Sequence, residues 1–170
     1  VWVGDGKTEP EIIKQDDKTA RHIGSTVWSD ENLYLNINDA IAQIFKEYED
    51  IYLDIEYYDE KPSGVDASFF EIRYIDAGGA QARSETVWGG GTERFVTATV
   101  KLTAAQLNNS FNGSDFVLTT RSFLYGYSGK GVKISKITLR PSDTQSFVTA
   151  RITTDKTGNI MYDTDKAKTF

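Results

Sequence analysis

The stretch IYLDIEYYD, residues 51–59, alternates between two kinds of side chain along most of its length. Its odd-numbered positions up to Tyr57 are apolar or aromatic, whereas Asp54 and Glu56 stand on even-numbered ones. Alternation with a period of two is the pattern of a β-strand that has one buried face and one wet face. Because such strands belong to antiparallel sheets, this stretch favours an antiparallel β-fold.

The same alternation recurs on both sides of this stretch. It is found in LYLNIND (33–39), FFEIRYI (69–75), FVTATVKL (95–102), FVLTTR (116–121) and VKISKITL (132–139). In the last of these the apolar parity changes after Ile134, so we expect a β-bulge near Ser135 or Lys136. The predicted inward-facing set is Leu35, Ile37, Leu53, Ile55, Phe70, Ile72, Val100, Leu102, Phe116, Leu118, Ile137 and Leu139.

One segment has helical rather than strand periodicity. DAIAQIFKEY, residues 39–48, places Ile41, Ile44, Phe45 and Tyr48 on one face of a helix, and Asp39 is the expected N-cap. Many strands with glycine-rich turns and one short helix predict an all-β fold, a two-sheet antiparallel β-sandwich of the jelly-roll type.

A boundary is expected near the sequence RPSD at 140–143. Residues 1–143 are predicted to form the sandwich unit. Residues 144–170 begin a new alternation, and we interpret them as a C-terminal extension that is either an added strand or the start of a following β domain. Because the chain begins with Val1, we interpret it as an excised or processed fragment.

Composition excludes several classes of function. The chain of 170 residues has a formal net charge of −6, which makes nucleic acid and anionic membranes poor partners. No apolar run approaches the length of a membrane span. There is no cysteine, so disulfides and thiolate chemistry are absent. His22 is the one histidine, and no G-x-S-x-G motif accompanies it.

Two carboxylates on one strand raise the question of catalysis. Asp54 and Glu56 lie on the same face, roughly 7 Å apart at the backbone, a spacing that a glycosidase pair could use. Glu71 and Arg73 are expected on the outer face of another strand. Charge pairing between strands on solvated faces accounts for these residues without catalysis, and we favour that interpretation.

Several loops are rich in oxygen ligands. The candidates for a structural Ca²⁺ site are Asp16, Asp17, Asp59 and Asp115. Calcium takes six to eight oxygens, including backbone carbonyls, so scattered loop residues are sufficient. The alternative is that these residues only form turns, as Asp, Asn, Ser and Gly do unaided.

Aromatic residues flanked by glycine or polar residues are the strongest binding candidates. They are Trp28, Trp88, Tyr125 and Tyr127, with Arg94 and Asp30 as candidates for hydrogen bonds to sugar hydroxyls. A flat aromatic face can stack on the C–H face of a sugar ring. We expect the glycines at 89–91 to keep the face of Trp88 clear. The alternative is that these aromatics cap the ends of the sandwich.

A family resemblance rests on several of these segments. The segments NLYLNINDAI, DIYLDIEYYDE, SFFEIRYIDA, GGGTERFVTATVKLTAAQLNNSFNGSDFVL and VKISKITLRPSD together resemble the carbohydrate-binding modules appended to bacterial polysaccharide-degrading enzymes. These modules have a galactose-binding-like jelly roll, and the resemblance covers roughly residues 30 to 143. Many of them have a tryptophan just before the strand that corresponds here to VTATVKL. Phe95 occupies the position of that tryptophan in this chain, so the resemblance implies a core role for Phe95 and leaves Trp88 on the preceding loop.

The resemblance implies a function and a location. We expect a non-catalytic module, secreted or on the bacterial cell surface, that targets an attached enzyme to a plant or microbial polysaccharide. Its expected partners are an oligosaccharide or polysaccharide and other domains of the same polypeptide. A structural Ca²⁺ is the expected cofactor. The alternatives are a structural or interdomain β-sandwich without a ligand and, third, a small jelly-roll lyase or hydrolase domain.

Overall fold

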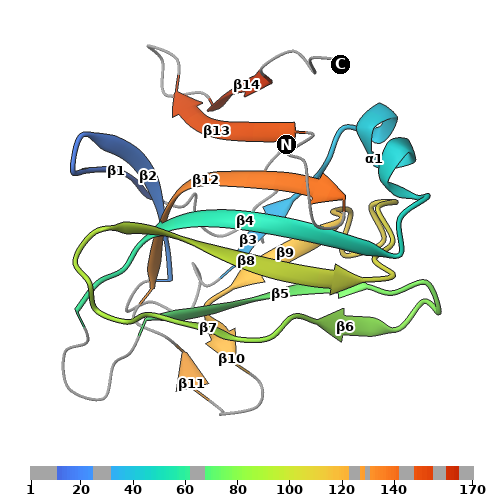
Figure 1. Ribbon diagram of the computed structural model, residues 1–170, viewed down its shortest axis with the longest axis horizontal. Coiled ribbons are helices and arrows are strands. Elements are labelled where there is room, and N and C mark those ends of the chain that lie inside the picture. The colour runs from blue at the N-terminus through green and yellow to red at the C-terminus, as the bar shows by residue number, and fades with distance from the viewer. Residues whose placement is uncertain are drawn as a thin grey trace.

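The computed structural model confirms the predicted fold class. The residues it describes are 11–24, 32–61, 68–122, 127–128, 131–141, 148–154 and 160–164. Two antiparallel sheets pack face to face, and one short helix lies at the end of the sandwich (Figure 1). In this part of the chain, no helix has the length and apolar character needed to cross a membrane.

The first sheet is built around the long strand β4. Its long strands are β4 (Asp50–Tyr58), β8 (Phe95–Thr103) and β12 (Val132–Pro141). Its shorter strands are β1 (Glu11–Gln15), β2 (Lys18–Ile23), β13 (Val148–Thr154) and β14 (Ile160–Thr164). β4 lies between β8 and β12, and the far edge of β12 pairs first with β2 and then with β13.

The second sheet has β5 and β9 at its centre. Its strands are β3 (Asn32–Leu35), β5 (Phe69–Ile75), β6 (Gln81–Arg83), β7 (Val87–Trp88) and β9 (Phe116–Thr119). β10 (Arg121–Ser122) and β11 (Tyr127–Ser128) form a separate small hairpin. The strands β3, β4, β5, β8, β9 and β12 alternate between the two sheets along the chain, which is the winding expected of a jelly roll.

The core lies between the two sheets and contains the residues predicted from alternation. The predicted inward set is buried, except that Leu35 and Ile37 are partly buried and pack against the core. Tyr57 of β4 meets Phe70 of β5 edge to face, with ring centroids 5.2 Å apart. Alternation therefore identified the buried face of each long strand.

The predicted β-bulge is confirmed. The register between β4 and β12 shifts between Ile134 and Lys136, which leaves Ser135 as the extra residue. Because of this shift, Ile134 and Ile137 are both buried although they differ in parity.

The helix differs from the prediction in its first turn. α1 spans Asp39–Phe45, and its N-cap is Asn38 rather than Asp39. The Asn38 Oδ1 accepts a hydrogen bond from the backbone N–H of Ala40 at 3.0 Å. Asp39 is instead the first helical residue, where its charge complements the positive end of the helix dipole.

The buried face of α1 also differs from the prediction. Ala42 and Phe45 are buried, whereas Ile44 is 50% exposed. The helix ends at Phe45, so Tyr48 lies in the following turn and is 37% exposed. A helix of two turns is too short to bury a full apolar stripe. The segment 39–48 has helical periodicity throughout, but the helix itself ends at Phe45.

Phe95 lies on the outer face of the first sheet, not in the core as predicted. It stands opposite Tyr58, and their ring centroids are 5.4 Å apart. The Lys18 ammonium lies 4.8 Å from the centre of the Phe95 ring. Strand parity explains the result, because Val96 and not Phe95 shares the face of Val100.

The C-terminal segment adds strands to the first sheet. β13 pairs with β12 through four residue pairs, from Lys136 with Arg151 to Leu139 with Val148, and β14 pairs with β13. The division of the chain near residue 143 into two units stays a prediction.

The helix cap yields a stability prediction. Asn38→Ala should lower the free energy of unfolding by about 1 kcal/mol, because it removes the side-chain acceptor for an unpaired N–H of the first turn. Asp39→Ala should cost about 0.5 kcal/mol or less, since only a charge–dipole interaction at the surface is lost. Urea denaturation of the two variants checks this order, and an equal or larger loss from Asp39→Ala would contradict it.

Candidate functional site

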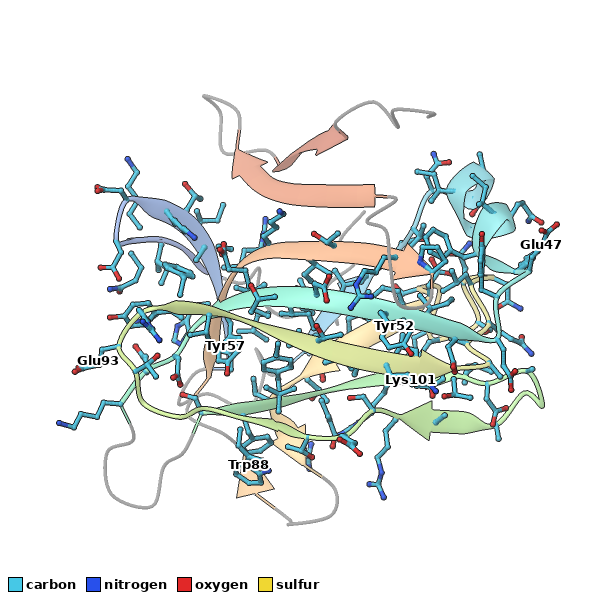
Figure 2. All side chains as sticks on the ribbon, viewed as in Figure 1. Glu47, Tyr52, Tyr57, Trp88, Glu93 and Lys101 are labelled. Carbon is cyan, nitrogen blue, oxygen red and sulfur yellow. The ribbon has the colours of Figure 1, made fainter. Side chains whose placement is uncertain are left out.

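Trp88 is an exposed ring that rests on a buried one. It ends β7, directly opposite Phe69 at the start of β5. The two ring centroids lie 5.1 Å apart, and the ring planes are inclined at 43°. Phe69 is fully buried, whereas Trp88 is 42% exposed. Figure 2 shows Trp88 near the edge of the molecule, far from the helix end marked by Glu47. The indole is therefore braced and still presents area to solvent.

The loop after Trp88 is fixed by the carboxylate of Asp59, which follows β4. The backbone N–H groups of Gly91 and Thr92 donate to the two carboxylate oxygens of Asp59, at 2.9 and 2.8 Å. The Gly89 N–H donates to the Ser68 carbonyl at 2.8 Å. The backbones of Asp59 and of the loop also exchange hydrogen bonds. This loop is thus ordered by contacts within the protein.

The structure gives the glycines a different role from the predicted one. A Cβ atom on Gly89 would lie 3.0 Å from Asp59 Oδ1 and 3.2 Å from the Ser68 carbonyl oxygen. Gly91 has a φ of 75°, in the left-handed region that favours glycine. The glycines therefore allow the loop to close around a carboxylate.

The carboxyl of Asp59 is stabilised in its charged form. Burial alone would raise its pKa, but the N–H groups of Thr92 and Gly91 outweigh burial and hold the pKa below the ordinary value. A charged carboxylate accepts hydrogen bonds more strongly than a neutral group. Asp59 therefore holds the Trp88 loop most firmly at neutral pH.

Next to Phe69, the outer face of the second sheet carries a buried ion pair. Arg73 Nε and Nη2 both lie 2.8 Å from Glu71 Oε1, and Glu71 is fully buried. Among the described residues, no group donates a hydrogen bond to Glu71 Oε2. The expectation that Glu71 lies on a wet face was wrong, because parity predicts the face of a strand but not whether that face is covered.

The segments that contain Trp88 and Tyr127 are both linked to β5, one directly and the other through β10. β7 with Trp88 pairs with β5, and Arg73 of β5 donates a hydrogen bond to the Arg121 carbonyl of β10. β10 pairs with β11, which contains Tyr127. The side chain of Tyr127 and the residues Trp28, Asp30 and Tyr125 lie outside the described part of the chain.

Of the two hydrogen-bonding candidates, Arg94 lies within the described part. Its side chain is exposed, and its carbonyl accepts the Asp59 N–H at 3.0 Å.

Sequence reasoning missed Phe69 as the residue on which the Trp88 ring rests. The signal was its outward parity in FFEIRYI, which puts an aromatic ring on the face away from the core.

Asp54 and Glu56 form charge pairs on the outer face of the first sheet. Arg140 Nε donates to Asp54 at 2.8 Å, and Lys18 Nζ lies 2.6 Å from Glu56. Burial alone would raise the pKa of each carboxyl. The hydrogen bonds from Arg140 to Asp54 and from Lys18 to Glu56 outweigh burial, so both pKa values lie below their ordinary values. A glycosidase acid needs a raised pKa, so these contacts favour charge pairing.

The four calcium candidates have other roles in the structure. Asp16 and Asp17, with φ of 48° and 62°, form the two-residue turn between β1 and β2. The Asp115 carboxylate accepts the N–H groups of Ile37 and Asn109, at 2.7 and 3.0 Å, while burial raises its pKa. Within the described residues, no group of three or more acidic or histidine side chains could hold a metal. These contacts give each of the four residues a structural role, and a calcium site at any of them stays a prediction.

Comparisons with models of known protein families, with curated proteins and with solved structures find no match for this chain. A braced, partly exposed indole beside an ordered loop is suited to stacking on a flat apolar face.

The role of Asp59 can be tested by Asp59→Asn, with Asp16→Asn as the matched control. An amide can replace only one of the two acceptor oxygens, so we expect Asp59→Asn to cost about 1–3 kcal/mol of unfolding free energy at pH 7. Asp16 lies exposed in a turn that tolerates Asn, and its replacement should change stability by less than about 0.5 kcal/mol.

The same pair of variants predicts a pH dependence. The pKa of Asp59 is lower in the folded chain, so its contribution is present above the unfolded pKa and is lost as pH falls through the folded one. The stability difference between the parent and Asp59→Asn should therefore shrink in acid. Urea denaturation at several pH values measures it, and a difference that grows in acid would contradict the assignment.

Proposed function

We propose that this chain is a non-catalytic carbohydrate-binding module that targets an attached, secreted enzyme to a plant or microbial polysaccharide. The observation that carries the proposal is the exposed indole of Trp88, braced on the buried ring of Phe69. An aromatic that is already fixed loses little conformational freedom when a sugar ring stacks on it. The resemblance to modules of bacterial polysaccharide-degrading enzymes agrees with this surface.

The surroundings of Trp88 support a sugar more than an ion. Asp59, around which the loop after Trp88 closes, is buried, and its carboxylate is engaged by backbone N–H groups of that loop. Arg94 is exposed in the same loop and can donate hydrogen bonds to hydroxyl groups. Polysaccharide, and not nucleic acid or a membrane, is the proposed partner, and the proposed location is extracellular.

An interdomain contact is the alternative, because an exposed tryptophan can equally pack against another domain of the same polypeptide. In that case the chain would bind no sugar by itself. A polysaccharide lyase or hydrolase is a weaker alternative, since the paired carboxylates Asp54 and Glu56 are held by Arg140 and Lys18.

The proposal predicts the effect of replacing Trp88. In gels that contain soluble xylan, galactomannan, mixed-linkage glucan or pectin, the parent chain should be retarded by at least one polysaccharide. Trp88→Ala should weaken that binding by roughly 5- to 30-fold, which corresponds to about 1–2 kcal/mol for one aromatic contact. Trp88→Phe should retain most of the binding, because it keeps a ring on Phe69.

Ile12→Ala is the matched control, because Ile12 is also an exposed apolar side chain on a strand, at 38%. It should leave the retardation unchanged. Equal retardation of the parent and Trp88→Ala would overturn the role of Trp88. If the parent is retarded in none of the gels, the module proposal fails and the interdomain alternative gains support. Release of reducing ends from the same polysaccharides would instead support the enzyme alternative.

A structural Ca²⁺ stays a prediction. If a calcium ion binds the native chain, removing it with EDTA should lower the melting temperature, because a ligand that binds only the folded state stabilises it. An ion present at 100 times its Kd adds about 2.7 kcal/mol. A melting curve that EDTA and added Ca²⁺ both leave unchanged would show that no such ion contributes to stability.

A further inference from the structure

A cleft of about 460 Å³ opens at the helix end of the sandwich. Its walls come from three segments: residues 46–49 after α1, Ala77 in the turn between β5 and β6, and residues 104–108 after β8. Its volume lies within the range of about 300–1,000 Å³ that is usual for small-molecule sites. Glu47, which lines this cleft, lies far from Trp88 in Figure 2.

The walls of the cleft are tied to the sandwich by backbone hydrogen bonds. The Ala104 N–H donates to the Glu49 carbonyl, and the Gln106 N–H donates to the Ile75 carbonyl at 2.8 Å. In the turn that carries Ala77, the Asp76 N–H donates to the Ala80 carbonyl at 2.9 Å. The cleft is therefore formed before any ligand arrives, as small-molecule sites usually are.

Tyr48 presents an aromatic ring to the cleft. It is 37% exposed, and its ring centroid lies 6.3 Å from that of Phe45, which is buried. This is the arrangement of Trp88 on Phe69, an exposed ring braced on a buried phenylalanine. Tyr48 therefore offers a fixed surface for an apolar face of a ligand.

Polar side chains surround this ring. The Asn108 Nδ2 donates to the Gln106 Oε1 at 2.8 Å, which orients the two amides toward each other. Each amide keeps further donor or acceptor capacity, and Glu47 and Glu49 add acceptors. Two acidic residues beside the single Lys46 disfavour an anionic ligand. Mixed donors and acceptors around an aromatic ring match a neutral ligand with many hydroxyl groups.

The backbone of the cleft is held in an uncommon conformation. Ala104 has a φ of 52°, a left-handed value that a residue with a Cβ adopts at an energetic cost. Its N–H is bonded to Glu49, so the surrounding structure maintains this conformation. Backbone strain of this kind clusters at binding sites, where it preserves a particular shape.

We propose that this cleft is a second binding site, for a neutral, hydroxyl-rich ligand such as a short oligosaccharide, with Tyr48 as its stacking surface. Gln106 and Asn108 bond the hydroxyl groups. The ligand class follows from the cleft's own groups, so the proposal stands or falls separately from the Trp88 surface. With both sites occupied, the chain would hold one polysaccharide at two points or two chains at once, and avidity would exceed the affinity of either site.

The test is a titration of the ¹⁵N-labelled chain with cellohexaose, xylohexaose and mannohexaose, followed by amide chemical shifts. We expect saturable shifts at Gln106 and Asn108 with at least one of the three sugars. Tyr48→Ala should weaken that binding roughly fivefold or more, and Tyr48→Phe should keep most of it, because the ring makes the contact. Ile44→Ala is the matched control, since Ile44 is exposed on α1, shortly before Tyr48 in the chain, but does not line the cleft.

Asn108→Ala provides a variant that removes polar contacts without touching the ring or the core, because Asn108 is exposed. It too should weaken binding at the cleft. Saturable shifts around Trp88 alone would support the proposed function and overturn the second site. Shifts at the cleft alone would support the second site and overturn the role of Trp88. No saturable shift at the cleft with any of the three sugars, or equal binding by Tyr48→Ala, also overturns this proposal.

Discussion

The pairing of β4 with two long neighbours is the constraint on which the rest of the structure depends. β4 is hydrogen-bonded to β8 along all nine of its residues and to β12 along most of them. Ile51, Leu53 and Ile55 on its inner face are fully buried, and burial of each such side chain stabilises the fold by about 1.5–3 kcal/mol. β4 is also followed directly by Asp59, whose carboxylate holds the Trp88 loop, and preceded directly by Glu49, which lines the cleft. Nine residues at about 3.3 Å each place these two points about 30 Å apart.

The two proposed surfaces share one physical arrangement. In each, an exposed aromatic ring rests on a buried phenylalanine, Trp88 on Phe69 and Tyr48 on Phe45. A ring held in this way has little rotamer freedom left to lose on binding, which lowers the entropic cost of association. The surfaces differ, because Trp88 lies on the short strand β7 and does not line the cleft, whereas Tyr48 does. The first is suited to the side of a long chain, and the second can enclose more of a short ligand.

Charged residues divide into two groups with different environments. On the outer face of the first sheet, Asp54 and Glu56 are partly exposed and paired with cations across neighbouring strands. Such pairs contribute little to stability individually, but they keep the face polar. On the outer face of the second sheet, Glu71 is fully buried and holds Arg73. Alternation predicted the face of all these residues correctly, yet it could not distinguish a solvated face from a covered one.

The sequence alone determined the parity of the long strands, the bulge at Ser135 and the all-β class, because each depends on a pattern within one segment. Its errors at the N-cap of α1 and at Tyr48 came where a short segment carries little pattern. The error at Phe95 came from the family resemblance, which was followed against the parity of the strand. Only the tertiary structure decided that Asp59 closes the loop of Trp88, through contacts to Gly91 and Thr92 that span 32 and 33 positions. It alone placed Phe69 behind Trp88. Local periodicity records which side of a strand faces inward, whereas the meeting of distant loops depends on which strands pair and in which register.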